Sequence, residues 1–315
     1  MANFNDRTGE ENVNKQGLKM KIIKYRGNKS LDIIFEDGTI VLDKSYDAFK
    51  RGSIRNYNYE YCKVINRVGE ENINNYGSLM KIINYKNADN IDVIFPEYNY
   101  IVRAKQYSKF RNGSIKSPYD KSIFNVGYIG EGEFSSSNFE KGINKDNSKS
   151  YEIWYGMMKR CYDKNGKRYK GYGGKGVIVC EGWHNFQNFA KWYEENYYEV
   201  KGERMDLDKD ILVKGNKIYS PKTCIFVPRR INTLFVRNDE KRGSLPIGVC
   251  SYKDKYRVVS IKDKFLGTFD TPEEAFHAYK IAKEKYIKEI ADEYKDRIPK
   301  SLYNAMCSWE IEITD

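Results

Sequence analysis

The N-terminal half of the chain contains the same sequence twice. Residues 7–35, RTGEENVNKQGLKMKIIKYRGNKSLDIIF, align with residues 67–95, RVGEENINNYGSLMKIINYKNADNIDVIF, at a constant offset of 60. After one inserted residue the alignment continues, so that Tyr46 corresponds to Tyr107. A match of this length predicts two copies of one small domain, followed by a second half of different design.

Each copy has the pattern of a small β domain. MKIIKY reads as a strand, LDIIFEDGTIVL as a hairpin with Glu-Asp-Gly at its tip, and YDAFKRGSI as a helical turn followed by a closing strand. This predicts a small closed barrel of SH3-like size. The Gly-Glu-Glu-Asn runs at 9–12 and 69–72 lead into the first core strand, or alternatively Glu10 and Glu11 hold a metal.

The chain as a whole is expected to be a multidomain α+β protein, because 315 residues exceed what one core usually encloses. The repeats contain no histidine and no catalytic constellation, so we expect them to bind a partner, with a protein as one candidate. The Gly-, Ser- and Asn-rich stretch GYIGEGEFSSSNFEKGINKDNSKS predicts a linker. The expected boundaries are 1–60 and 61–122 for the repeats, 123–150 for the linker, 151–240 for a middle domain and 241–315 for a C-terminal domain.

Charge and composition favour a polyanionic partner. The formal net charge is +11, and the 27 tyrosines offer surfaces on which bases can stack. No run of 18 apolar residues is present and the N-terminus is polar, which excludes a membrane span and a signal peptide. Six cysteines without a close pair fit reduced thiols better than a zinc knuckle or a disulfide framework, so we expect a protein of the bacterial cytoplasm.

The C-terminal part combines basic strands with a well-marked helix start. GVCSYKDKYRVVSIKDKFLG (248–267) reads as short strands joined by Lys-Asp turns. In LGTFDTPEEAFHAYKIA (266–282), Thr271 is placed as N-cap, Pro272 as the first helical residue and Glu274 as the third, which predicts a capping box. A basic sheet supported by a helix is one way to build a surface that reads nucleic acid.

The words GV, KYR, LGTFDTPEEA and AY within 245–290 resemble the APETALA/ERF DNA-binding domain, in the version found in phage and mobile-element nucleases. The resemblance implies a three-stranded sheet that enters the major groove with a helix packed behind it. It would place Lys253, Lys255, Tyr256 and Arg257 against DNA, and Lys262 and Lys264 on phosphates. The alternative is an ordinary α+β module with a solvated basic face.

The middle segment predicts two helices around a glycine-rich basic loop. Ile153, Met157 and Cys161 share one helical face, and HNFQNFAKWYEENY reads as a second amphipathic helix. Between them, YKGYGGKGVIVC leads into a strand, and its backbone N–H groups are candidates for cradling phosphates. The cations expected to grip DNA here are Lys159, Arg160, Lys167, Arg168, Lys170 and Lys175.

The order W..M..RCY, Y.GYGG.G and VC..W resembles phage-type HNH homing endonucleases, with residues 207–232 in the place of that family's β-hairpin and short helix. An HNH site needs a histidine base and metal ligands. The resemblance puts Asp208 at the first ligand position, but Lys209 stands where the catalytic histidine belongs. Thr223 stands where the central asparagine belongs and Ile231 near the last histidine, with Asn232 as a possible substitute ligand.

These departures favour binding over cleavage. Of the two histidines, we expect His277 to be structural and His184 to be a weak candidate for the base. Asp208 and Asp210 are candidates to hold Mg²⁺ from alternate positions of one strand face. We therefore predict a sequence-specific double-stranded DNA-binding protein on a degenerate HNH scaffold, with no cofactor. The alternatives are an active Mg²⁺-dependent endonuclease using Asp208, Asp210 and His184 or Asn232, and a protein-binding inhibitor of a host defence system.

Overall fold

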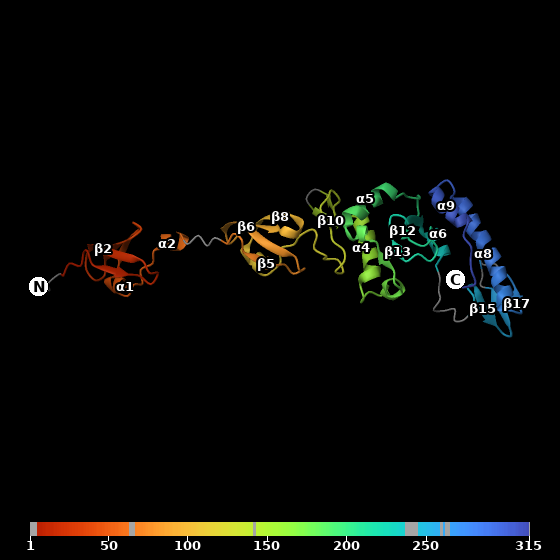
Figure 1. Cartoon of the computed structure of the whole chain (residues 1–315), viewed down its shortest axis with the longest axis horizontal. Helices are drawn as coiled ribbons and strands as arrows, with labels where there is room; N and C mark the ends of the chain where they lie inside the picture. Colours follow the sequence, from red (N-terminus) through yellow and green to blue (C-terminus); the bar gives the residue numbers. More distant parts are fainter. Residues whose placement is uncertain are drawn as a thin grey trace.

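The computed structural model describes residues 5–62, 67–140, 143–236, 245–258, 261 and 265–314. These residues form a mixed α and β structure with several small sheets, most of them antiparallel. Figure 1 shows the parts following one another along the long axis, with the first repeat at one end and helices α8 and α9 at the other. No helix in the described ranges is long and apolar enough to cross a membrane.

The first repeat is a four-stranded antiparallel meander with a short helix. Its strands are β1 (Glu11–Val13), β2 (Lys19–Tyr25), β3 (Leu31–Phe35) and β4 (Ile40–Lys44), in that spatial order. Helices α1 (Tyr46–Lys50) and α2 (Tyr57–Cys62) follow. The inner face of the sheet packs its apolar residues against Phe49 of α1, so this small domain has a core of its own.

The second repeat reproduces this arrangement. Strands β5 (Glu71–Ile73), β6 (Leu79–Asn87), β7 (Asn90–Phe95) and β8 (Tyr100–Lys105) form the meander. The inserted residue is taken up by the 3₁₀ turn η1 (Pro96–Tyr98), and Phe110 of α3 (Tyr107–Arg111) fills the place of Phe49. The predicted duplication of sequence is therefore a duplication of structure.

Both sheets are open, in contrast to the closed barrels that the sequence predicts. The expected closing strand after α1 is not formed in the described residues, and the chain is held there by isolated hydrogen bonds. The Lys15 N–H donates to the Gly52 carbonyl at 2.8 Å, and the Asn14 side chain donates to the Ile54 carbonyl at 3.0 Å. Gly52 has φ +65°, and a Cβ there would lie 2.8 Å from the Val13 carbonyl oxygen, so the close approach requires glycine.

A cluster of one arginine, one glutamate and one tyrosine recurs in the two repeats. The Tyr46 hydroxyl donates to Glu10 at 2.9 Å, and the Tyr107 hydroxyl donates to Glu70 at 2.8 Å. In each copy the preceding arginine pairs with the glutamate and places its guanidinium 4.2 Å from the centre of the tyrosine ring. Glu10 is thus engaged inside its repeat, which argues against the metal-binding alternative for this run.

The segment expected to be a linker is largely packed. Phe124, Ile129 and Phe134 lie against the core of the middle part. The Gln187 amide both donates to the Phe134 carbonyl at 2.9 Å and accepts from the Phe134 N–H at 3.0 Å. Only afterwards do β9 (Ser137–Glu140) and β10 (Ile143–Asn147) form a separate hairpin. The high content of Gly, Ser and Asn predicts a linker, but the few aromatic residues of the segment are enough to pack it against the core.

The middle part is built from two helices on a small β framework. Helix α4 (Lys149–Tyr162) is followed by the 3₁₀ turns η2 (Tyr169–Gly171) and η3 (Gly173–Lys175), strand β11 (Ile178–Val179) and the turn η4 (Glu181–His184). Helix α5 (Phe186–Asn196) confirms the second predicted helix. Strands β12 (Met205–Asp208), β13 (Ile218–Tyr219) and β14 (Ile225–Pro228) lead to α6 (Arg229–Leu234), and β12 pairs with β14 antiparallel.

The C-terminal part is a three-stranded sheet with a long helix, as predicted. Strands β15 (Val249–Tyr252), β16 (Lys255–Val258) and β17 (Thr268–Phe269) pair in sequence order. Helix α8 (Pro272–Tyr294) begins with the predicted capping box at Thr271 and Glu274. Helix α9 (Lys300–Cys307) follows.

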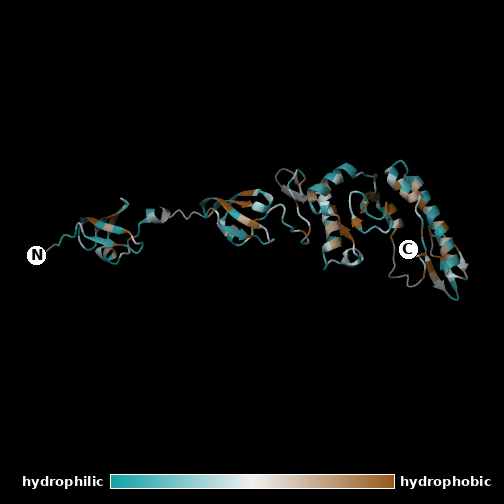
Figure 2. Cartoon of the chain, in the orientation of Figure 1, coloured by the Kyte–Doolittle hydropathy of each residue, from teal (hydrophilic) through white to brown (hydrophobic). Residues whose placement is uncertain are grey.

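Strand β14 belongs to two cores at once. Cys224 and Phe226 face the core formed with α4 and α5, whereas Ile225 and Val227 face the core formed with α8 and α9. Ile231 of α6 joins the second core, and the Arg230 guanidinium pairs with Glu293 of α8. The expected boundary at residue 240 therefore runs through a shared core. Figure 2 shows this part of the chain with its hydrophobic residues on the strands between the helices.

Candidate nucleic-acid interface

The C-terminal sheet presents its basic side chains by strand alternation. Along β16, Lys255 and Arg257 are exposed, whereas Tyr256 and Val258 pack toward the core behind the sheet. Because successive side chains of a strand point to opposite faces, only Lys255 and Arg257 can lie on the exposed face. Tyr256, which the sequence places against DNA, therefore lies on the opposite face of the strand from Lys255 and Arg257.

Tyr252 is the aromatic residue on the exposed face, and sequence reasoning missed it. Its side chain is 44% exposed and stands opposite Lys255 across the strand pair. The Arg257 guanidinium carbon lies 5.1 Å from the centre of its ring, and the Lys253 ammonium lies 5.7 Å from it. The predicted contact residues Lys253 and Arg257 thus meet at one tyrosine. Tyr252 could have been predicted from the register of β15 with β16, which pairs it with Lys255.

Lys255 is less available than its two neighbours. Its ammonium lies 2.7 Å from a carboxylate oxygen of Asp270, and this hydrogen bond raises the pKa of Lys255 above its ordinary value. Both groups are exposed, so the pair is weak and a phosphate can compete for the lysine. The predicted phosphate contacts Lys262 and Lys264 lie outside the described residues.

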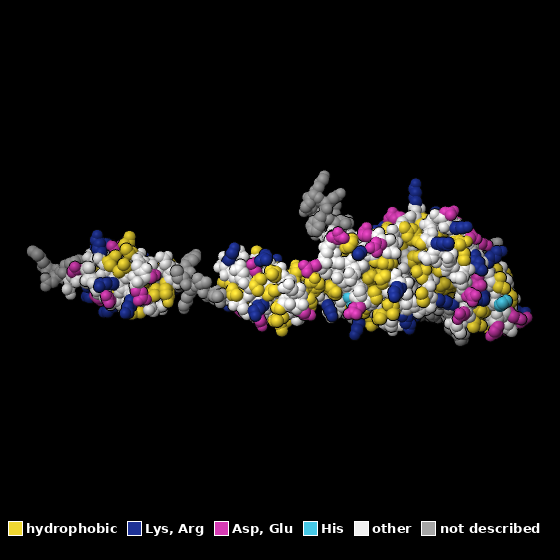
Figure 3. Space-filling model, turned by 45° about the horizontal axis from the view of Figure 1, so that its top comes forward, with side chains coloured by type: hydrophobic (Ala, Val, Ile, Leu, Met, Phe, Trp, Pro, Cys, Tyr) yellow, Lys and Arg dark blue, Asp and Glu magenta, His cyan; other side chains and the backbone are white. Residues whose placement is uncertain are grey.

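A second group of cations lies at the end of α4 and in the loop after it. Among the described residues no ion pair engages the exposed members of this group. They are Lys159, Lys167, Arg168, Lys170 and Lys175. Figure 3 shows Lys and Arg mixed with Asp and Glu on the visible face of the molecule.

The glycine-rich loop does not offer the backbone cradle that the sequence suggests. The N–H groups of Tyr172, Gly176 and Val177 donate to carbonyls of the same loop. The loop is pressed against α4, because a Cβ on Gly173 would lie 2.0 Å from the Cys161 carbonyl oxygen. Contacts with an anion would therefore come mainly from side chains here.

The hairpin β12–β14 and helix α6 have the strand–strand–helix order expected from the HNH-like sequence motifs. Asp208 is the last residue of β12, and one of its carboxylate oxygens accepts the N–H groups of Asp210 and Ile211, both at 2.7 Å. Burial raises the pKa of Asp208, and these two hydrogen bonds oppose that shift. The carboxylate therefore serves the turn that follows the strand.

Lys209, at the position of the missing histidine, is 7% exposed and fully engaged. Its ammonium donates to both carboxylate oxygens of Asp210, at 2.6 and 2.7 Å, and to the Asn216 carbonyl at 2.8 Å. The Asn216 side chain donates back to the Lys209 carbonyl at 2.8 Å. Asp210 lies beyond the end of β12, so it does not form the predicted alternating pair with Asp208 on one strand face.

Asn232 lies next to a different carboxylate from the one expected. Its amide donates to Asp206 at 3.3 Å, and Asp206 also pairs with Arg229 at 3.1 Å. Asp206 and Asp208 share the face of β12 whose partners Val227 and Ile225 point into the core with α8 and α9. The C-terminal part therefore covers the face on which an HNH metal site is expected.

His184 has a structural environment. Its Nε2 lies 3.1 Å from the Val179 carbonyl oxygen and 3.4 Å from the Tyr162 hydroxyl. Burial lowers its pKa. No described hydrogen bond joins it to Asp208 or Asp210, so the predicted catalytic set is not brought together.

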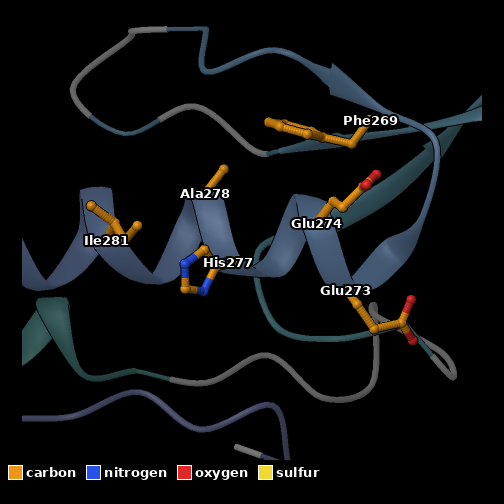
Figure 4. Close-up of a pocket in the computed structure, with 6 residues that line it drawn as sticks. All are labelled: Phe269, Glu273, Glu274, His277, Ala278 and Ile281. Atoms are coloured by element: carbon orange, nitrogen blue, oxygen red, sulfur yellow. The ribbon is translucent and has the colours of Figure 1, made fainter.

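His277 lies on the exposed side of α8 and does not belong to the hairpin β12–β14. Figure 4 shows it in a shallow depression with Phe269, Glu273, Glu274, Ala278 and Ile281. Glu273, Glu274 and His277 are not arranged so that they could hold a metal ion, and no other group of three or more His, Cys, Asp or Glu in the described part of the chain could do so. The five cysteines described are free thiols.

Comparisons with known proteins add no family to these observations. No protein-family model matches the chain, and neither a curated protein nor a solved structure resembles it significantly.

Proposed function

We propose that this protein binds double-stranded DNA, with sequence preference, in the cytoplasm of a bacterial cell. The observation that carries the proposal is the exposed face of the C-terminal sheet, where Arg257 and Lys253 flank Tyr252. Arginine recognises guanine through two hydrogen bonds in the major groove, and a two- or three-stranded sheet fits that groove. Tyr252 holds the guanidinium in place before DNA arrives.

The basic loop supplies a second point of contact in this proposal. The exposed cations around Lys167 and Lys175 have no carboxylate partner in the described ranges, so they are available to phosphates. In Figure 1 the end of α4 with its loop and the sheet β15–β17 lie along the same edge of the molecule. A duplex lying along that edge would meet phosphate contacts at one point and base contacts at the other.

The middle part is proposed to be an HNH-like scaffold without a working metal centre. The hairpin and helix have the expected order. However, Lys209 is locked to Asp210, and Asn232 is paired with Asp206 rather than with Asp208. The repeats are proposed to be small SH3-like β domains whose sheets remain open.

The test is duplex binding measured by fluorescence anisotropy over a range of salt concentrations. Selection from a random duplex pool supplies the target. The affinity of the wild-type chain should fall steeply with salt, and Arg257→Ala should flatten the preference among sequences. Lys109→Ala, an exposed change in the second repeat, is the matched control. No duplex binding at low salt would refute the proposal.

An active endonuclease is the second candidate, and Asp208 at the end of a hairpin followed by a helix is the observation that favours it. It would require Mg²⁺, with Asp208, Asp210 and His184 or Asn232 rearranged around the metal. Incubation of supercoiled plasmid with Mg²⁺ or Mn²⁺ decides the question. Nicking by the wild-type chain that Asp208→Ala abolishes would establish cleavage, and absence of nicking at high protein concentration would remove it.

A protein partner is the third candidate, and it concerns the repeats. Both copies expose apolar side chains at matching positions of the outer sheet face, Val13 with Ile73 and Ile40 with Ile101. Such a duplicated face suits two equivalent sites on a protein, as an inhibitor of host defence would need. If wild-type protein fails to bind DNA, this face becomes the leading candidate site.

A further inference from the structure

Arg160 differs from the other cations at the end of α4. Its guanidinium carbon lies 5.4 Å from the centre of the Tyr172 ring and 5.7 Å from that of Tyr219. The side chain is partly buried, and its Nε is enclosed without a hydrogen-bond partner. The five exposed cations nearby are hydrated, whereas this one has lost much of its water.

No carboxylate compensates this charge in the described part of the chain. Arg160 takes part in no described ion pair. The Lys209 ammonium lies 6.0 Å from the centre of the same Tyr219 ring, and this lysine is neutralised by Asp210. A desolvated guanidinium without an anion is costly, so the free protein holds a binding group at the expense of stability.

The glycine loop shapes the space beside Arg160. Gly173 sits on the Cys161 carbonyl oxygen, which places Tyr172 next to the guanidinium. The surroundings are poorly hydrated, since burial raises the pKa of the neighbouring Cys161 thiol to about 11. Lys159 and Lys175 lie exposed around this position.

We propose that Arg160 is the anchor for one backbone phosphate of bound duplex DNA, with Tyr172 and Tyr219 fixing its guanidinium. A planar guanidinium can give a phosphate two parallel hydrogen bonds, and in a poorly hydrated site these are stronger than the contacts of exposed lysines. The inference rests on the proposed DNA binding. It adds that one partly buried cation makes the strongest phosphate contact of the middle part.

The experiment compares Arg160→Met with Lys170→Met in the full chain. Both remove one positive charge from the same region, but Lys170 is exposed. Anisotropy with a fluorescent duplex in EDTA should show about a tenfold loss of affinity for Arg160→Met, against about twofold for Lys170→Met. Each should reduce the slope of log affinity against log salt by roughly one.

Thermal unfolding of the free protein separates a phosphate anchor from a structural residue. Removing an uncompensated cation should leave the Tm of Arg160→Met unchanged or raised, whereas a structural arginine would lower it on removal. Duplex should raise the Tm of the wild-type chain more than that of the variant. Equal affinity losses in the two variants, or a lowered Tm with unchanged affinity, would overturn the anchor.

A third arm uses inorganic phosphate alone. Stabilisation by inorganic phosphate that Arg160→Met abolishes, without any difference in duplex binding, would assign the position to a free anion and overturn the DNA assignment. If the wild-type chain binds no duplex at low salt, the proposed function itself fails. If it binds and Arg160→Met behaves like Lys170→Met, only the anchor fails.

Discussion

At the scale of single residues, the two repeats contain a natural comparison. Asp32 accepts from both terminal nitrogens of Arg26, at 2.6 and 2.8 Å, and from the Asp43 N–H at 2.9 Å. Asp92, at the same position of the second repeat, relies on the Ala104 N–H and on Asn84 instead. The Arg26 hydrogen bonds lower the pKa of Asp32 to about 2, and the Ala104 N–H is the main cause that lowers the pKa of Asp92.

We predict that Arg26→Ala raises the pKa of Asp32 toward its ordinary value near 3.9 and leaves that of Asp92 unchanged. Because the folded-state pKa of Asp32 is below the unfolded value, its contribution to stability is present above about pH 4 and lost as the pH falls toward 2. Carboxyl carbon titration by NMR measures both residues in one sample. An unshifted Asp32 in the variant would contradict the prediction.

Sequence patterns located the important segments more reliably than the individual side chains. The motif KYR lies in strand β16, but whether Tyr256 or Tyr252 faces outward depends on strand register, which a three-residue motif does not reveal. Similarly, the alignment gave Asn232 to Asp208, whereas strand pairing and the helix position give it to Asp206. Asp206 and Asp208 lie two residues apart on one strand face, so the sequence pattern does not distinguish them.

At the scale of elements, local sequence signals predict where helices start and end, but they do not predict whether a sheet closes into a barrel. The start of α8 and the two helices of the middle part agree with the sequence, because caps and apolar spacing act within one or two turns. The prediction of a closing strand in each repeat is wrong, because an asparagine side chain takes the hydrogen bonds that a strand ladder would use. This residue is Asn14 in the first repeat and Asn74 in the second. A side chain acting over 40 residues leaves no local signal.

The capping box gives a prediction for helix α8. Glu274 donates its N–H to the Thr271 hydroxyl at 3.2 Å, and the Thr271 N–H donates to the Glu274 carboxylate at 3.2 Å. Thr271→Ala should destabilise the first turn of α8 by about 1 kcal/mol, which corresponds to roughly fivefold faster amide exchange there. Hydrogen-exchange mass spectrometry checks this, with exposed Ser301→Ala in α9 as control. Unchanged amide hydrogen exchange at residues 272–276 would show that the capping box does not stabilise the start of α8.

At the scale of the whole molecule, the cores do not follow the boundaries that sequence composition suggests. Repeat 2 continues into the middle part through Tyr98, Tyr119 and Tyr128, whose rings lie 4.8 and 6.2 Å apart in succession. The hairpin is enclosed by α4 and α5 on one face and by α8 and α9 on the other. Composition marks where polar residues gather, but it does not report which apolar faces meet.

The shared core predicts joint unfolding. Ile231→Ala, at a fully buried position of α6, should cost about 2–5 kcal/mol and lower the melting of both the middle and the C-terminal parts together. Ile33→Ala, equally buried in the first repeat, should affect a separate transition. Differential scanning calorimetry of the full chain resolves the two cases. Separate melting of the C-terminal sheet and the hairpin would show that their core is not shared in solution.

Because residues of β14 belong to two cores, the C-terminal part cannot be exchanged as an independent module. A cassette exchanged at residue 240 would remove α8 and α9 from Ile225, Val227 and Ile231, leaving an apolar face uncovered. A transplant that keeps the sheet β15–β17 folded has to begin near the start of α4, at residue 149, and carry the hairpin with it. Under the proposed function, a new specificity would therefore be easier to reach by substitutions on the exposed sheet face than by exchange of modules.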